Sequence, residues 1–159
     1  MQRITAVLHT YNDALRLGRC LETLYPCDEI LVVDHGSSDD TVQVASEYGA
    51  SIIRAKAEAS LQSYLQGARA AWILCLDSRE SLTEALAASL YEWKTELVRT
   101  GVSSFSVLLR EETPRGWIEH SEPQTRLVPA NWNRWSGPLP ANDPRAIMLQ
   151  GEILRFAFP

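Results

Sequence analysis

Three apolar runs in the first half of the chain each stop at polar side chains, and this pattern constrains the fold more than any other. The runs cover residues 4–8, 30–33 and 72–76, and the polar residues that follow them begin at His9, Asp34 and Asp77. Short, uninterrupted apolar runs are typical of strands whose two faces are both covered. Because segments with helical spacing separate the runs, the sequence predicts an α/β fold with a mostly parallel sheet flanked by helices.

The individual elements follow from the same patterns. We expect strands at residues 4–8, 29–34, 51–54 and 72–77, and helices at 12–24, 39–48, 56–70 and 81–98. Ser81 and Glu84 have the spacing of a capping box, which predicts that the last of these helices begins at Ser81. After Gly101 we expect a strand at 104–109, loops and short antiparallel strands over the sheet edge at 111–143, and a strand or short helix at 149–156.

Length and charge limit the classes of protein that fit. The 159 residues fit one domain, residues 1–159, and the hydrophobic share of 45% is typical of a globular chain. The net charge of −5 argues against nucleic acid as the main partner, because nucleic-acid binders carry a basic excess. An anionic small ligand remains compatible with this charge if the site supplies local donors.

Cysteine usage and hydropathy bear on the compartment. The cysteines 20, 27 and 75 form no Cys-x-x-Cys pair, which argues against disulfides and structural zinc, and the apolar run around Cys75 predicts a buried free thiol. No apolar run reaches the length of a membrane span, and the first one is too short for a signal peptide. We therefore expect a cytoplasmic protein with no membrane span, and self-association into a homo-oligomer is left open.

The polar clusters after the strands are the candidates for a binding site. Ligands of open parallel sheets bind beyond the carboxyl ends of the strands, so residues 9–13, 34–38 and 77–80 should meet at one rim. A simpler reading is that Asn12 or Asp13 caps the first helix and that Ser38, Asp39 and Asp40 cap the second. Asp34 fits capping less well, because a carboxylate at the end of a buried strand must find donors or solvent. It could accept a hydrogen bond from a base N–H, with Tyr11 as a stacking face.

Two stretches carry a resemblance to a known family. Residues 4–13 (Ile-Thr-Ala-Val-Leu-His-Thr-Tyr-Asn-Asp) resemble the opening strand and loop of family-two glycosyltransferases with the GT-A fold. Residues 31–41 (Leu-Val-Val-Asp-His-Gly-Ser-Ser-Asp-Asp-Thr) resemble that family's Val-Asp-Asp-Gly-Ser-x-Asp-x-Thr signature, and residues 72–77 are similar to the strand that leads into its Asp-x-Asp motif. The likeness implies a nucleotide-binding half over residues 1–100 and an acceptor-side half over residues 101–159.

The resemblance also implies roles for single residues. Thr10, Tyr11 and Asp13 would line the nucleotide pocket, Asp34 would accept from uracil or another base, and Gly36 and Ser37 would shape the pocket. Asp77 would stand at the position of the metal and the diphosphate. Members of the family move a sugar from a nucleoside diphosphate, here most simply a UDP-sugar, to an acceptor hydroxyl. They usually use Mn²⁺ or Mg²⁺ to stabilise the departing diphosphate.

Several positions depart from the family pattern. Arg79 replaces the second acid of Asp-x-Asp, and His35 replaces the second acid of the other signature. A single carboxylate at Asp77 would hold a divalent ion weakly, with Glu80 as a candidate helper. Alternatively, the Arg79 guanidinium pairs directly with the diphosphate. The simpler reading is that Arg79 points to solvent or pairs with Glu80 or Glu84.

No motif identifies a catalytic base. An inverting transfer needs a carboxylate or imidazole near the acceptor hydroxyl, and the candidates are His120 and Asp143, with Glu119 beside them. Surface exposure without a role is the alternative for each of them. Trp117, Trp132 and Trp135 offer faces for an acceptor sugar, but packing is the more common use of tryptophan.

Two functions of different classes therefore fit the sequence. The first is a small glycosyltransferase that uses a nucleoside-diphosphate sugar and an unknown acceptor. The second is a catalytically impaired homologue that binds a nucleotide or a protein partner. A nucleotidyltransferase fits less well, because such enzymes carry a Gly-rich basic loop after the first strand, and residues 9–12 (His-Thr-Tyr-Asn) do not form one.

Overall fold

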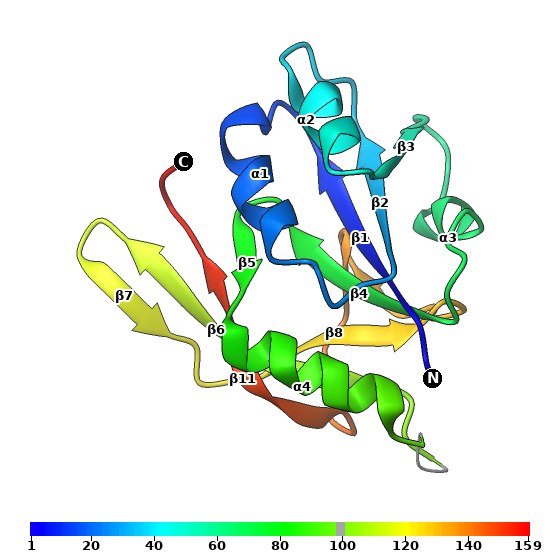
Figure 1. Cartoon of the computed structure of the whole chain (residues 1–159), viewed down its shortest axis with the longest axis vertical. Helices are drawn as coiled ribbons and strands as arrows, with labels where there is room; N and C mark the ends of the chain where they lie inside the picture. Colours follow the sequence, from blue (N-terminus) through cyan, green and yellow to red (C-terminus); the bar gives the residue numbers. More distant parts are fainter. Residues whose placement is uncertain (98–100) are drawn as a thin grey trace.

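The computed structural model describes residues 1–97 and 101–159 and shows an α/β fold built on one large sheet (Figure 1). The elements in chain order are β1 (Ile4–Thr10), α1 (Ala14–Glu22), β2 (Glu29–Asp34), α2 (Thr41–Glu47), β3 (Ser51–Arg54), α3 (Leu61–Leu65), β4 (Trp72–Asp77), β5 (Glu80–Leu82), α4 (Glu84–Thr95), β6 (Phe105–Thr113), β7 (Gly116–Glu119), β8 (Gln124–Pro129), β9 (Trp135–Ser136), β10 (Leu139–Pro140) and β11 (Ile147–Arg155). The strands of the main sheet follow the order β3-β2-β1-β4-β8-β6-β11-β5, and β7 pairs with β6. Strands β9 and β10 form a separate small sheet.

The first four strands form the parallel part that the sequence predicts. Strand β1 pairs in parallel with β2 and β4, and β2 pairs in parallel with β3. The second part is mixed: β8 is antiparallel to β4 and to β6, whereas β11 runs parallel to β6. This confirms an α/β sheet with an antiparallel section in the C-terminal part.

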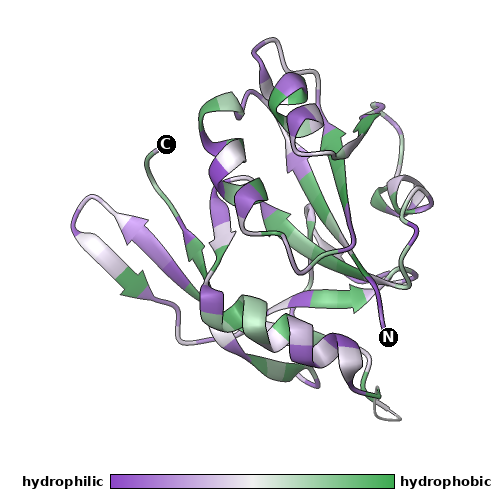
Figure 2. Cartoon of the chain, in the orientation of Figure 1, coloured by the Kyte–Doolittle hydropathy of each residue, from purple (hydrophilic) through white to green (hydrophobic). Residues whose placement is uncertain are grey.

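Both faces of the central strands are covered, which explains why their sequences are apolar along their whole length. Alternate residues point to opposite faces. Ile4, Ala6 and Leu8 of β1 pack in one cluster with α1, α2 and α4, whereas Val7 packs on the other face with Leu65 of α3. Figure 2 shows this as hydrophobic colour along β2, β4 and β8, in contrast to the hydrophilic outer end of β6.

The sheet is strongly curled between β4 and β5. Only the turn at Ser78 and Arg79 separates these two strands in sequence, yet β5 stands at the far end of the strand order. The sheet must therefore curl from β4 through β8, β6 and β11, so that β5 returns to a position near the end of β4. A network of buried charged side chains connects these strands, as described below.

The structure corrects two predicted helices. The helix expected at residues 56–70 is limited to Leu61–Leu65, capped by Ser60, because the Tyr64 hydroxyl bonds to both the backbone N–H and the carbonyl of Lys56 and holds that segment in another path. The helix expected from Ser81 begins at Glu84 instead. Thr83 is its cap, with its Oγ1 accepting from the N–H of Leu86, while residues 80–82 pair with β11 as a strand. The predicted end of this helix, at residue 98, lies outside the described residues.

The C-terminal part also differs from the prediction. Strand β8, which falls in the segment predicted to lie over the sheet edge, is an interior strand between β4 and β6. Residues 125–128 of β8 are buried, which an edge position would not provide. The last segment is predicted as a strand or a short helix, and the structure shows the strand, β11. Within the described residues, no helix has the length and apolar character needed to cross a membrane.

Candidate functional site

The carboxyl ends of β1, β2 and β4 lie side by side and form the rim of a groove. The parallel register sets this arrangement, because Thr10 is paired with Asp34 and His9 with Asp77. The groove has a volume of about 460 Å³, which is in the range of small-molecule sites. Its lining residues are His9, Thr10, Tyr11, Asp13, Arg16, His35, Asp77, Ser78 and Arg79. The structure thus brings together the three polar clusters that the sequence places at strand ends.

The loops after β1 and β2 are locked together by reciprocal hydrogen bonds. The backbone N–H of Asn12 donates to the Ser37 hydroxyl at 2.8 Å, and the backbone N–H of Ser38 donates to Oδ1 of Asn12 at 2.8 Å. Asn12 itself adopts a left-handed backbone conformation with φ 52°, which asparagine tolerates better than most residues. These contacts leave the Tyr11 ring projecting from a fixed loop, with 61% of the residue exposed.

The predicted capping roles at the helix starts turn out to be contacts between the two loops. Asp13 and Asp40 stand at the N-cap positions of α1 and α2, but neither side chain makes a capping hydrogen bond. Asp39 instead accepts from the hydroxyl and the backbone N–H of Thr41 and, at 3.2 Å, from the backbone N–H of Ala14. Asp39 therefore ties the start of α2 to the start of α1.

Asp34 organises the loop after β2, because its carboxylate accepts four hydrogen bonds. Its Oδ1 accepts from the hydroxyls of Thr10 (2.8 Å) and Ser37 (2.6 Å), and its Oδ2 accepts from the backbone N–H groups of Gly36 (3.2 Å) and Ser37 (2.9 Å). Burial alone would raise the pKa of Asp34, but these hydrogen bonds outweigh it and hold the pKa below its usual value. A base N–H could reach this carboxylate only by displacing one of the four donors.

Two histidines face each other on the rim. Nδ1 of His9 and Nε2 of His35 lie 2.9 Å apart, and the edge of the Tyr64 ring faces His9. One ring must donate and the other accept, so both rings cannot be charged in this geometry. Burial, and then the neighbouring His35, lower the pKa of His9 to about 4. His9 is therefore neutral near pH 7 and accepts or donates a single hydrogen bond in the pair.

The turn after β4 holds an ion pair at the centre of the groove wall. Nε of Arg79 donates to Oδ1 of Asp77 at 2.9 Å, Nη2 donates to Oδ2 at 3.1 Å, and the backbone N–H of Arg79 also donates to Oδ1. Burial alone would raise the pKa of Asp77, but the hydrogen bonds from Arg79 reverse this and lower it. The expectation that Arg79 points to solvent or pairs with Glu80 or Glu84 is wrong, because Asp77 holds the guanidinium at two points.

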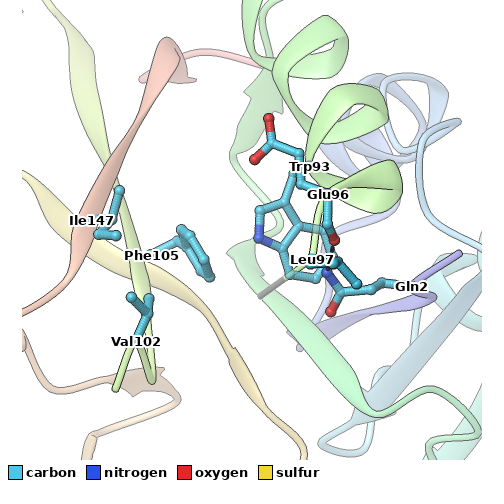
Figure 3. Close-up of a pocket in the computed structure, with 7 residues that line it drawn as sticks. All are labelled: Gln2, Trp93, Glu96, Leu97, Val102, Phe105 and Ile147. Carbon is cyan, nitrogen blue, oxygen red and sulfur yellow. Dashed lines mark hydrogen bonds between the residues drawn. The ribbon is translucent and has the colours of Figure 1, made fainter. Parts of the chain in front are cut away.

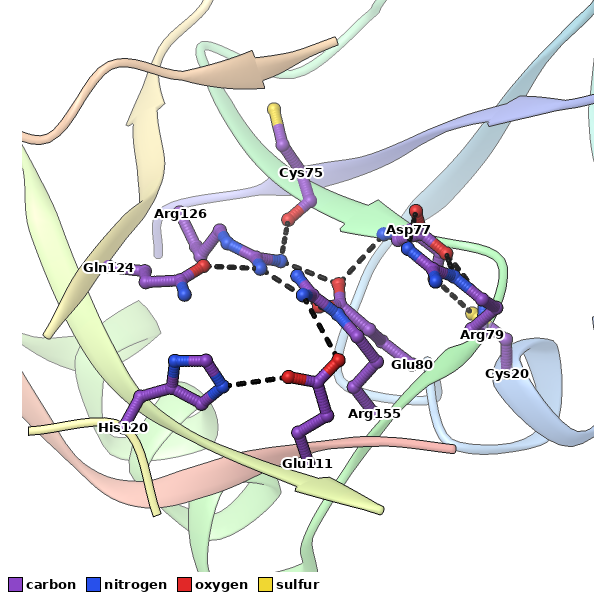
Figure 4. A network of polar contacts seen from close by, with 10 residues as sticks. All are labelled: Cys20, Cys75, Asp77, Arg79, Glu80, Glu111, His120, Gln124, Arg126 and Arg155. Atoms are coloured by element: carbon purple, nitrogen blue, oxygen red, sulfur yellow. Dashed lines mark hydrogen bonds and ion pairs between the residues drawn. The ribbon is translucent and has the colours of Figure 1, made fainter. Parts of the chain in front are cut away.

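Glu80, next in the chain, faces the other way, into the interior of the curl (Figure 4). Its carboxylate forms a two-point pair with the guanidinium of Arg126, with N–O distances of 2.6 and 2.9 Å, and a further pair with Arg155 at 3.0 Å. The Arg126 and Glu80 side chains are 1% and 0% exposed. Burial alone would raise the pKa of Glu80, but Arg126 outweighs it and the pKa is lowered. Glu80 is therefore not free to help bind a metal ion.

This buried network reaches from the groove to the far strands. The backbone N–H of Asp77 donates to Oε1 of Glu80, Arg155 lies 3.7 Å from the carboxylate of Glu111, and Glu111 lies 2.9 Å from Nε2 of His120 (Figure 4). Asp77 and His120, predicted separately from the sequence, are thus linked through fixed charges. Sequence reasoning missed Arg126 and Arg155, although an arginine inside the apolar strand at residues 125–128 signals a buried ion pair.

The other candidate bases and the tryptophans lie elsewhere. The Asp143 side chain is 2% exposed and accepts from the Ser104 hydroxyl, from Arg134 and from the backbone N–H of Arg145. Glu119 forms an exposed ion pair with Arg110 on the β6–β7 hairpin. Trp132 is buried against the second face of the sheet, and Trp117 packs edge-on against Phe156.

A second hollow lies at the opposite end of β1. Figure 3 shows it between Trp93 and Leu97 on one side and Val102, Phe105 and Ile147 on the other. Gln2 and Glu96 supply its polar atoms, and the Gln2 amide already donates to the Glu96 carbonyl. The hollow is small and largely apolar, so it lacks the donors and acceptors that the rim groove offers.

Comparison with known proteins identifies the fold and the family. Residues 5–137 match the family described as Glycosyl transferase family 2. The chain belongs to this family. It is similar to a TPR repeat-containing protein of Synechococcus elongatus, 30% identical over 126 residues that cover 76% of this chain and 30% of that protein. It is also similar to a protein of Rickettsia felis named as an uncharacterized glycosyltransferase, 41% identical over 54 residues that cover 33% of this chain and 19% of the relative. The chain therefore matches less than a third of the length of these curated relatives.

The fold is the GT-A fold of solved glycosyltransferases. Glucosyl-3-phosphoglycerate synthase from Mycobacterium tuberculosis, in complex with Mn²⁺ and UDP-glucose, aligns with a TM-score of 0.55 at 20% identity, covering 69% of this chain and 44% of that chain. The same enzyme with Mg²⁺ and UDP aligns with a TM-score of 0.53 at 18% identity, covering 68% of this chain and 44% of that chain. At such identities the likeness establishes the fold.

A divalent cation, as those structures hold, does not fit the donor set of this family-2 chain. Asp77, at the expected metal position, has both carboxylate oxygens engaged by Arg79, and Glu80 is engaged by two arginines. Across residues 1–97 and 101–159, no three His, Cys, Asp or Glu side chains gather where they could share a metal ion. To bind Asp77, a hard cation would have to displace the Arg79 guanidinium, which contacts both oxygens of that carboxylate.

Proposed function

We propose that this chain binds a nucleoside-diphosphate sugar, a UDP-sugar in the simplest case, in the rim groove and transfers the sugar to an acceptor hydroxyl. The observation that carries the proposal is the convergence of Tyr11, the loop organised by Asp34, and Asp77 on one groove. The GT-A fold supports it, because a solved enzyme with this fold holds UDP in one structure and UDP-glucose in another.

Each part of the groove has a role in this proposal. The exposed Tyr11 ring offers a stacking face for the base, since aromatic stacking is tolerant of base identity. Thr10, Gly36 and Ser37 shape the loop around Asp34. The Asp13 carboxylate fixes the loop after β1 by accepting a hydrogen bond from the backbone N–H of Tyr11 at 3.0 Å. The diphosphate then lies toward the Asp77 turn, which forms the opposite wall of the groove.

For the general base, the geometry favours His120 over Asp143. A base must give up its lone pair to the acceptor proton, and Asp143 is buried with both oxygens engaged. The His120 side chain is 34% exposed, and Glu111 orients one ring nitrogen and leaves the other for a substrate. Contacts through Arg155 and Glu80 connect this pair to the Asp77 turn.

The ion pair at the metal position favours a second candidate function. With Asp77 unable to hold a cation, the domain would be a catalytically impaired homologue that binds a nucleotide or a protein partner without turnover. Such a binding domain would use the same groove and the same Tyr11 face. The chain matches less than a third of the length of the curated relatives named above. Either function is compatible with a domain that works within a larger assembly.

A titration of UDP and of a panel of nucleoside-diphosphate sugars, with and without Mn²⁺, tests the proposal. We expect UDP binding in the groove and release of UDP from at least one donor when acceptors are supplied. Tyr11→Ala should weaken UDP binding by about tenfold or more, Tyr11→Phe should bind normally, and Tyr25→Ala, which removes another exposed ring, is the control. Binding without release across the whole panel would support the second function. No binding of any nucleotide would reject both.

A further inference from the structure

The Arg79 guanidinium is anchored by Asp77 and still has donors to offer. A guanidinium carries five N–H groups in a planar fork. Nε and Nη2 each direct one of them to Asp77, whereas Nη1 makes no hydrogen bond to any of residues 1–97 or 101–159. The side chain is 42% exposed and lines the rim groove. Asp77 thus orients the Arg79 guanidinium but leaves some of its N–H donors available to a ligand.

A second guanidinium lies on the same groove. Arg16 projects from the first turn of α1, and its nearest carboxylate oxygen, on Asp13, is 3.9 Å away. That contact is too long for a hydrogen bond, so the donors of Arg16 are not committed to it. Two guanidinium groups carry the same charge as one divalent cation, and guanidinium recognises phosphate oxygens through paired hydrogen bonds.

We infer that Arg79, oriented by Asp77 and assisted by Arg16, binds the diphosphate of the ligand directly and takes the place of a divalent cation. This inference rests on the proposed function for the identity of its ligand. Asp77 is then a positioning residue for Arg79 rather than a metal ligand. No covalent step is involved, and the pair supplies fixed positive charge where the diphosphate lies.

Calorimetric titration of the whole chain with UDP, in EDTA and then in excess Mn²⁺, tests the inference without an activity assay. We expect UDP affinities that agree within about twofold in the two conditions. Arg79→Ala should weaken UDP binding in EDTA by about tenfold or more, the size expected for a charge-assisted hydrogen bond. Arg79→Ala should weaken the binding of UMP less than that of UDP, because UMP lacks the second phosphate. Arg69→Ala is the matched control, since Arg69 lines none of the groove and its side chain is 85% exposed.

Two further variants separate the roles of the pair. Asp77→Asn keeps the size of the side chain but loses the charge that orients Arg79, so UDP binding should weaken equally with and without Mn²⁺. Arg79→Asp removes the guanidinium and leaves two acids on the turn. That variant should bind Mn²⁺ measurably by electron paramagnetic resonance, and its UDP binding should become dependent on Mn²⁺. Circular dichroism identifies any variant that fails to fold, and Arg79→Gln then replaces Arg79→Ala.

The outcomes distinguish this inference from the proposed function. UDP binding that requires Mn²⁺ and survives Arg79→Ala overturns the inference and leaves nucleotide binding intact. UDP binding that is independent of Mn²⁺ yet unchanged in Arg79→Ala also overturns it, because the diphosphate is then held elsewhere. Failure of UDP to bind in either condition overturns the inference and the proposed function together.

Discussion

Arg79 and Asp77 form a two-point ion pair across a tight turn, with N–O distances of 2.9 and 3.1 Å, on the wall of the rim groove. The same turn joins a groove-lining residue to Glu80, which is buried between two arginines. One side of the turn is therefore available to a ligand, while the other is fixed by the protein interior. This arrangement makes the turn a rigid wall of the groove.

Breaking the buried pair at Arg126 should be costly. Arg126→Met leaves the Glu80 carboxylate with Arg155 as its one remaining cationic partner among the described residues and removes the hydrogen bonds to the Cys75 carbonyl and to Gln124. Removing one partner of a buried ion pair typically costs about 3–5 kcal/mol. Urea unfolding measures this loss. Arg69→Met removes an arginine whose side chain is 85% exposed and lies 3.5 Å from Glu29, so it should change the unfolding free energy by less than about 1 kcal/mol. A similar small loss in Arg126→Met would contradict a structural role for the network.

Replacing the Asp34 carboxylate with an amide should loosen the loop that it organises. In Asp34→Asn, an NH2 group replaces one of the two carboxylate oxygens. Depending on the orientation of the amide, this donor faces either the two backbone N–H groups or the two hydroxyls that the carboxylate accepts from. We expect a loss of about 1–3 kcal/mol in unfolding free energy and faster amide hydrogen exchange at Gly36 and Ser37. Asp40→Asn is the control, because the Asp40 side chain makes no capping bond. Unchanged exchange at Gly36 and Ser37 would show that Asp34 does not hold this loop.

The histidine pair predicts a specific pH dependence of stability. The pKa of His9 is lowered to about 4 in the folded chain, whereas an unfolded histidine has a pKa near 6.5. The unfolded state therefore binds more protons between these values, and the unfolding free energy falls as the pH drops from about 6.5 to about 4. Between pH 7 and pH 5, the wild type should lose about 1–2 kcal/mol more than His9→Gln. Urea unfolding at both pH values measures this, and equal losses in the two proteins would refute it.

Gly151 should tolerate no side chain. It has φ 99° and lies in the irregular part of β11, where an added Cβ would come within 2.3 Å of the backbone nitrogen of Leu86 in α4. Gly116 has a comparable φ of 114° but open space around the position. Gly151→Ala should therefore destabilise the protein by at least about 2 kcal/mol more than Gly116→Ala, since both carry backbone strain and only the first adds a backbone clash. Thermal unfolding of the two variants compares them directly.

Local sequence patterns predicted most of the first half of the chain. The strands at residues 29–34, 51–54 and 72–77 match the structure, and the first two helices differ at their ends only, whereas the third is limited to Leu61–Leu65. These elements are specified by their own apolar periodicity and by the turn residues between them. The convergence of His9, Asp34 and Asp77 on one rim was also predictable, because parallel strands with their ends at polar residues leave no other arrangement.

The region after β4 was predicted less well, because its elements depend on partners far along the chain. Residues 80–82 have helix-forming neighbours and an apparent capping box at Ser81, yet they form a strand because β11, about 70 residues later, offers backbone partners. The partner of Arg79 within the folded chain could not be read from the sequence either. Glu80 and Glu84 are close to it in the chain, but Glu80 is held by Arg126 and Arg155, and this leaves Asp77 to hold Arg79.

By itself, the sequence determined the four parallel strands of the first half and the polar side chains that three of them carry to the rim. Only the tertiary structure decided what each of those side chains binds: Asp34 is saturated by its own loop, and Asp77 is held by Arg79. The physical reason is that apolar periodicity acts over a few neighbouring residues, whereas the pairing of a buried charge is fixed by whichever opposite charge the folded strands bring within hydrogen-bond distance.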